Sequence, residues 1–135
     1  MRMMISAVLL ALLLCSCVTS TERCDPPFPD QMSESGKPVA ANIEAMISGV
    51  YLFYYLPIWS GKWTSPNRRD YEMFTDYVKP RFIYRMFDML GQRRKWAGVE
   101  DVNIYERSSG WIGLGIFWKR SIHASAVAIE GEKKR

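Results

Sequence analysis

The apolar residues of this 135-residue chain fall into two blocks, residues 1–18 and 43–129, separated by a polar segment rich in proline. A hydrophobic core needs a sustained supply of apolar side chains, so only the second block predicts a folded unit. That unit has roughly 90 residues, enough for one small domain that buries a modest fraction of its surface. We therefore expect a single domain that gains stability from a membrane, a partner or a second copy of itself.

The first apolar block is typical of a secretory leader. Arg2 supplies a positive start, and residues 5–14 are ten uncharged residues rich in leucine. Ten helical residues span about 15 Å, half of a bilayer core, which is too short for a transmembrane helix. A basic start followed by a short apolar run predicts export from the cytoplasm.

The end of the leader, Leu14-Cys15-Ser16-Cys17, resembles the lipobox of bacterial lipoproteins. In that family a leucine stands three residues before the acceptor cysteine and a small residue stands directly before it. The resemblance implies cleavage after residue 16, lipid on Cys17 and attachment to a membrane. It covers residues 1–17 and implies a location rather than an activity. The alternative is ordinary cleavage after Ser20, which would release a soluble secreted protein.

Val18 stands where an aspartate would retain an enterobacterial lipoprotein in the inner membrane. The resemblance therefore implies the outer membrane, facing the periplasm, with the inner membrane and the cell surface as open alternatives. After processing, Cys24 is the cysteine that remains unmodified. A lone thiol in an oxidising compartment either pairs with another thiol or stays free.

Residues 17–42 predict a tether between the lipid and the domain. This segment has four prolines and no apolar periodicity, and proline favours extended conformations. A semi-rigid spacer of this length, at about 3.1 Å per residue, would hold the domain as far as roughly 75 Å from the lipid. The alternative is an irregular arm that packs along the domain through Phe28 and Met32.

The second apolar block, residues 43–129, predicts an α+β domain. One amphipathic helix would pack on a small, mostly antiparallel sheet of three or four strands, in the order β-α-β-β-β. Apolar residues four apart indicate the helix, with Pro80 in its first turn and Gly98 at its C-terminal cap. The expected elements are a strand at 48–56, the helix at 79–96, strands at 99–107, 111–118 and 121–129, a turn at 108–110, a bend at 119–120 and a charged tail at 130–135.

The two sides of the strand at 48–56 differ in composition. Val50 and Leu52 alternate with Tyr51 and Phe53. We expect the aliphatic side to face the core and the aromatic side to need another cover. The last strand has a row of small side chains, which leaves room for a helix to lie on the sheet: Ile122, Ala124, Ala126 and Ala128.

The segment 59–69 predicts a loop that carries the candidate binding surface. Its indoles and cationic side chains suit either the water–lipid boundary or stacking on sugar rings. The alternative is a loop that folds back and buries both indoles. The candidate residues are Trp59, Lys62, Trp63, Arg68 and Arg69.

Catalytic and metal-binding patterns are weak in this sequence. His123 is the one histidine, and a hydrolase triad would have to combine it with Ser108 or Ser109 and with Asp101. The chain has no cluster of His, Cys, Asp and Glu at ligand spacing. We therefore expect no metal, no cofactor and no enzymatic activity.

Charge gives a mild indication of partners. The net charge is +4, and residues 62–95 contain nine basic residues and four acidic ones. This local excess of positive charge favours binding to anionic lipids or glycans. The alternative is that these residues form a solvated helix face. Export argues against a nucleic-acid partner. The leading hypothesis is a membrane-anchored binding or structural lipoprotein of the cell envelope that docks on another envelope component or on its own copy. The alternatives are a peptidoglycan or anionic-glycan binder and, third, a small envelope hydrolase.

Overall fold

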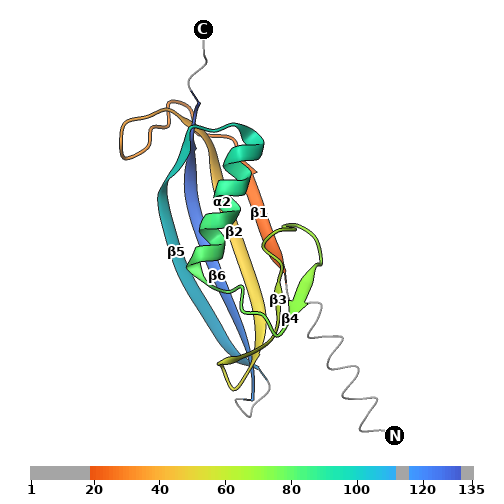
Figure 1. Cartoon of the computed structure of the whole chain (residues 1–135). Helices are drawn as coiled ribbons and strands as arrows, with labels where there is room; N and C mark the ends of the chain where they lie inside the picture. Colours follow the sequence, from red (N-terminus) through yellow and green to blue (C-terminus); the bar gives the residue numbers. More distant parts are fainter. Residues whose placement is uncertain (1–18, 112–115, 132–135) are drawn as a thin grey trace, which may run out of the picture.

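The computed structural model describes residues 19–111 and 116–131, and these form one antiparallel sheet of six strands with one helix on one of its faces (Figure 1). The predicted α+β class with three or four strands is wrong, because the structure is mostly β. The elements are β1 (Ser20–Asp25), β2 (Val39–Leu52), β3 (Leu56–Gly61), β4 (Tyr71–Met73), α2 (Pro80–Arg94), β5 (Gly98–Trp111) and β6 (Phe117–Ile129).

Strand β2 is the spine of the sheet, whose strand order is β4-β3-β2-β6-β5. Strand β6 pairs along one side of β2 for its whole length. On the other side, residues 42–47 of β2 pair with β1, and residues 49–52 pair with β3. Strands β1 and β3 therefore lie end to end along the same side of β2, which places the start of β1 against the end of β3.

The segment expected to be a tether differs from that prediction. Residues 20–25 form β1, and β2 already begins at Val39. The loop between them, residues 26–38, lies at one end of the sheet, and the turn between β2 and β3 lies at the other (Figure 1). Phe28 and Met32 are 74% and 61% exposed, so they do not anchor this loop. Backbone pairing with β2 orders β1, and such pairing requires no apolar periodicity in the sequence.

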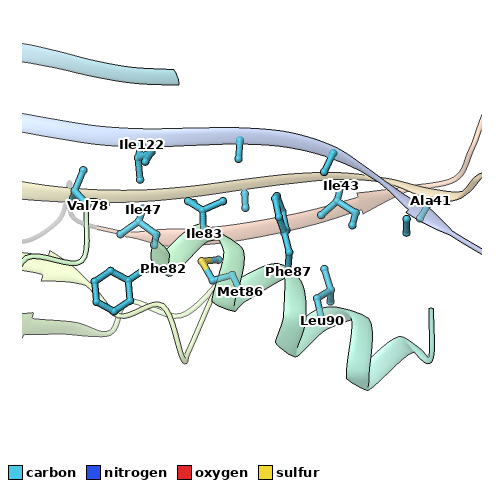
Figure 2. Close-up of a cluster of buried hydrophobic side chains, with 14 of the residues drawn as sticks. Ala41, Ile43, Ile47, Val78, Phe82, Ile83, Met86, Phe87, Leu90 and Ile122 are labelled. Carbon is cyan, nitrogen blue, oxygen red and sulfur yellow. The ribbon is translucent and has the colours of Figure 1, made fainter. Parts of the chain in front are cut away.

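The main core lies between α2 and the sheet, as Figure 2 shows. Ala41, Ile43 and Ile47 of β2 lie beside the small residues of β6, and the expected row of alanines there does lie under the helix. The helix places one apolar side on this floor: Phe82, Ile83, Met86, Phe87 and Leu90. Burying each such side chain contributes about 1.5–3 kcal/mol before the cost of ordering the chain.

The ends of α2 follow local rules. Pro80 occupies the first turn, where its missing N–H costs nothing, and Arg93 and Arg94 complement the negative end of the helix dipole. The helix ends at Lys95, which adopts φ 57° and ψ 41°, and the N–H of Trp96 donates to the carbonyl of Gly91. The predicted cap at Gly98 is wrong, since Gly98 begins β5.

The prediction for the two sides of residues 48–56 is also wrong. Tyr51 is fully buried in the main core on the helix side of the sheet, and its hydroxyl donates to Asp76 at 2.5 Å. Val50 lies on the opposite face with Trp59 and Phe117. Simple alternation along β2 places Tyr51 on the same side as Ile47, and the carboxylate of Asp76 satisfies its hydroxyl in the core. The strand ends after Leu52, where the next two residues have positive φ.

Among the residues described, the helix is followed by two long strands and not by the three that were expected, so the predicted strand at residues 111–118 is wrong: Trp111 ends β5 and Phe117 begins β6. Residues 108–110 continue β5 instead of forming a turn, and residues 119–120 continue β6 instead of bending, because each pairs with the other strand. The connection between the strands falls within residues 112–116, most of which lies outside the described part of the chain. Ladder hydrogen bonds here outweigh the turn propensity of Ser108, Ser109 and Gly110.

Candidate functional site

The sheet face opposite α2 is covered by no helix of the described chain, and we call it the open face (Figure 1). Strand register places its side chains in rows across the strands. The central row runs from Thr21 of β1 through Met46 of β2 and His123 of β6 to Tyr105 of β5. Four segments far apart in the sequence therefore contribute to one row, in which Met46 and Tyr105 are the direct neighbours of His123.

His123 is held by its neighbours on the open face. Its ring stacks on Tyr105 with centroids 5.0 Å apart and planes 5° apart, and its Nε2 lies 3.0 Å from the Ser121 hydroxyl. Partial burial lowers the pKa of His123, and the charges of Arg107 and Lys119 lower it further. The imidazole is therefore mainly neutral at pH 7.

Two shallow depressions flank this row on the open face. One, of about 540 Å³, is lined by both acidic and basic side chains, among them Arg23 and Glu44. The other, of about 600 Å³, is lined by His123 and Met46, by two cationic residues and one acidic residue, and by three serines: Arg107, Lys119, Glu106, Ser108, Ser109 and Ser121. Glu106 is paired with Arg120, which lies outside this lining. Cations combined with hydroxyl donors favour an anionic group in the second depression.

The hydrolase triad drawn from the sequence does not form. Ser108 and Ser109 line the same depression as His123, but the hydroxyl within hydrogen-bonding distance of its ring belongs to Ser121. Asp101 instead accepts a hydrogen bond from the N–H of Glu34, which belongs to the loop at residues 26–38. Within residues 19–111 and 116–131 no carboxylate hydrogen-bonds to His123, so the acid that would orient the imidazole is missing from this arrangement.

The predicted binding surface in residues 59–69 is divided between the two faces. Trp59 belongs to β3 and packs on the open face with Val50 and Ile58. Trp63 packs against the main core, with its ring 6.1 Å from that of Phe82 and beneath the guanidinium of Arg85. The two indoles therefore do not form one stacking platform.

The basic residues of that predicted surface stay near the start of β1. Lys62 donates its N–H to the carbonyl of Asp70, and its own carbonyl accepts the Ser20 hydroxyl. Arg68 and Arg69 are exposed in the loop that these bonds close. These cations remain accessible to an anionic partner.

The cysteines have separate positions. Cys24 of β1 is a free, half-buried thiol beside the main core, and burial raises its pKa. The predicted lipidation site, Cys17, lies outside the described residues. No group of three or more His, Cys, Asp or Glu side chains in the described ranges is arranged to hold a metal ion.

Three residues of the central row on the open face escaped the sequence analysis. Thr21, Met46 and Tyr105 carry no motif, and only the pairing of four strands joins them. The alternation of Asn103, Tyr105 and Arg107 was the available indication that β5 has a polar side.

Among helices in the described ranges, none is long and apolar enough to span a bilayer. Comparison of the chain with protein-family models, with curated proteins and with solved structures found no match, so its function is inferred from its own residues.

Proposed function

We propose that the protein is a binding module of the bacterial cell envelope, anchored by lipid on Cys17 and facing the periplasm from the outer membrane. The observation that carries the binding role is the open face. One side of the sheet is closed by α2, whereas the other presents the row from Thr21 to Tyr105 and two depressions. A broad face with polar, aromatic and charged side chains suits docking of a larger envelope component more than turnover of a small substrate.

The binding role is tested by photo-crosslinking in living cells. A photoreactive phenylalanine analogue replaces Tyr105 on the open face or, as the control, Tyr84 on α2. These tyrosines are 47% and 49% exposed, so they match in type and accessibility. We expect discrete adducts from position 105 and not from position 84. Equal yields from both positions, or none from position 105, would contradict the open face as the docking surface.

The anchor is tested separately, because it depends on a single residue. Intact mass of the mature protein should show diacylglyceryl and acyl groups on a chain that begins at Cys17. Cys17→Ser should abolish this mass and leave the leader attached. Normal processing and fractionation of the variant would refute the lipoprotein assignment, and density fractionation of the native protein distinguishes outer from inner membrane.

A second candidate, an anionic-glycan binder such as one for peptidoglycan, is favoured by the cations and hydroxyls of the second depression. Combined Arg107→Gln and Lys119→Gln should reduce retention on purified sacculi. Combined Arg68→Gln and Arg69→Gln removes the same charge from the loop and serves as the control. Equal losses in both variants would indicate unspecific attraction to a polyanion, and unchanged retention in both would exclude this site.

A further inference from the structure

The first described residue, Thr19, is held against the sheet by hydrogen bonds of its backbone. Its N–H donates to the Ser48 hydroxyl at 2.9 Å, and its carbonyl accepts the Ser48 N–H at 2.8 Å. Its carbonyl carbon lies so near Gly61 that an added Cβ there would be 2.4 Å away. Cys17 precedes Thr19 by two Cα–Cα steps, at most about 8 Å. Lipid on Cys17 would therefore bring this end of the sheet to the membrane surface.

This same end of the sheet carries a group of exposed apolar side chains, which we call the apolar rim. Strand register starts the rim beside Thr19, because Gly61 pairs with Tyr71, and Trp59 pairs with Met73. Its other end is the turn between β2 and β3, five residues along β3 from Gly61, or about 17 Å. The members are Phe53, Tyr55, Leu56, Tyr71, Met73 and Phe74, each between 44% and 78% exposed.

The composition around the rim fits a lipid surface. The rim contains both aromatic and aliphatic side chains. The adjoining loop carries three cationic residues, Lys62, Arg68 and Arg69, and two acidic residues lie nearby, Asp70 and Glu72. Glu72 already accepts the Tyr77 hydroxyl. Amphipathic aromatic rings and flanking cations are the groups that settle at the level of lipid head groups.

From these positions we propose that the apolar rim rests in the head-group region of the membrane that carries the Cys17 lipid. The proposal rests on the proposed lipid anchor and adds an orientation to it. In this orientation the part of the domain that contains β3 and β4 contacts the bilayer, and the loop at residues 26–38 points away from the membrane. The open face then stands at the side of the module, where an envelope partner can reach it.

The test uses the full acylated protein, purified from membranes and reconstituted into vesicles of phosphatidylethanolamine and phosphatidylglycerol. The vesicles contain a phospholipid with a photoreactive group near its glycerol backbone, and adducts are mapped by peptide mass spectrometry. We expect adducts in residues 53–56 and 71–74 to exceed those in residues 26–32 by about tenfold. The matched comparison is with Phe28 and Met32, which are equally exposed at the far end.

Variants then separate orientation from anchoring. Leu56→Ser with Phe74→Ser should lower lipid adducts at the rim several-fold, whereas Phe28→Ser with Met32→Ser should not. Both pairs are exposed, so the fold should persist, and far-ultraviolet circular dichroism checks it. Protein that floats with the vesicles but is labelled evenly, or that crosslinks through the rim to a second copy, overturns the orientation alone. Protein that carries no lipid and does not float overturns the proposed anchor and this inference with it.

Discussion

Gly61 offers the sharpest test of how β1 is attached to the sheet. An alanine Cβ at this position would lie 2.4 Å from the carbonyl carbon of Thr19, 2.5 Å from its oxygen and 2.7 Å from the nitrogen of Ser20. All three are backbone atoms, so no side chain can rotate to relieve the clash. Gly61→Ala must therefore push the start of β1 away from β3.

The cost follows from the hydrogen bonds at that point. Displacement of residues 19–20 would weaken or break the three hydrogen bonds between Thr19 and Ser48 and the bonds of Ser20 with Lys62 and Asn67, which are 2.6–3.1 Å long. Losing two or three bonds at about 0.5–1.5 kcal/mol each, with some strain, predicts a loss of about 2–4 kcal/mol in the free energy of unfolding.

Gly91 provides the matched control. It lies inside α2, and an added Cβ there meets no atom within 4 Å. Gly91→Ala should raise the free energy of unfolding by about 0.5–1 kcal/mol, because alanine loses less conformational freedom in a helix. Urea unfolding followed by tryptophan fluorescence measures both changes. A loss below about 0.5 kcal/mol for Gly61→Ala would refute the tight contact between Thr19 and β3.

Three further predictions concern the core and the open face. Tyr51→Phe removes the hydrogen bond to Asp76 and should lower the free energy of unfolding by about 1.5–3 kcal/mol, measured in urea, because the acceptor is charged. The folded-state pKa of His123 lies below its unfolded value, so the unfolded chain binds the proton first and stability should fall as the pH drops below about 6.5. His123→Gln should remove that part of the pH dependence between pH 7.5 and 5, and an unchanged slope would contradict the assignment. Ala126→Leu, under α2, should cost about 1–3 kcal/mol by overpacking, whereas Ser125→Leu, exposed on the other face, should cost little; thermal unfolding compares them.

The helix was the most predictable part of the fold. Its apolar residues recur every three or four positions from Phe82 to Leu90, and Pro80 marks its start. The row of alanines in β6 was equally informative, because only a close-packed neighbour explains small side chains on a buried strand. In both cases the information is local and repeats along the segment.

Strand β1 was not predictable in the same way. Its six residues, Ser20–Asp25, have no apolar alternation, and their order comes from pairing with residues 42–47 of β2. The two sides of β2 near Tyr51 were ambiguous because both are apolar. Asp76, 25 residues away in the sequence, provides the partner that lets the tyrosine occupy the core.

The candidate site depends on strand register more than on residue type. A bulge between Glu100 and Asn103, with Asp101 at φ 55°, places Tyr105 opposite His123. A slip of one residue would turn Tyr105 to the helix side. Sequence motifs cannot report such a register, which explains why the triad was considered and the row from Thr21 to Tyr105 was not.

The position of β6 inside the sheet, between β2 and β5, has a consequence for how the protein folds. Strands β2 and β6 are direct neighbours, although Val39 and its partner Ile129 are separated by almost the whole described chain. Closing so long a loop makes folding slow, and until β6 arrives both β2 and β5 have unpaired edges open to aggregation. During synthesis, the newest strand must insert between two older ones, so the facing edges of β2 and β5 stay unpaired until residues 117–129 have been made.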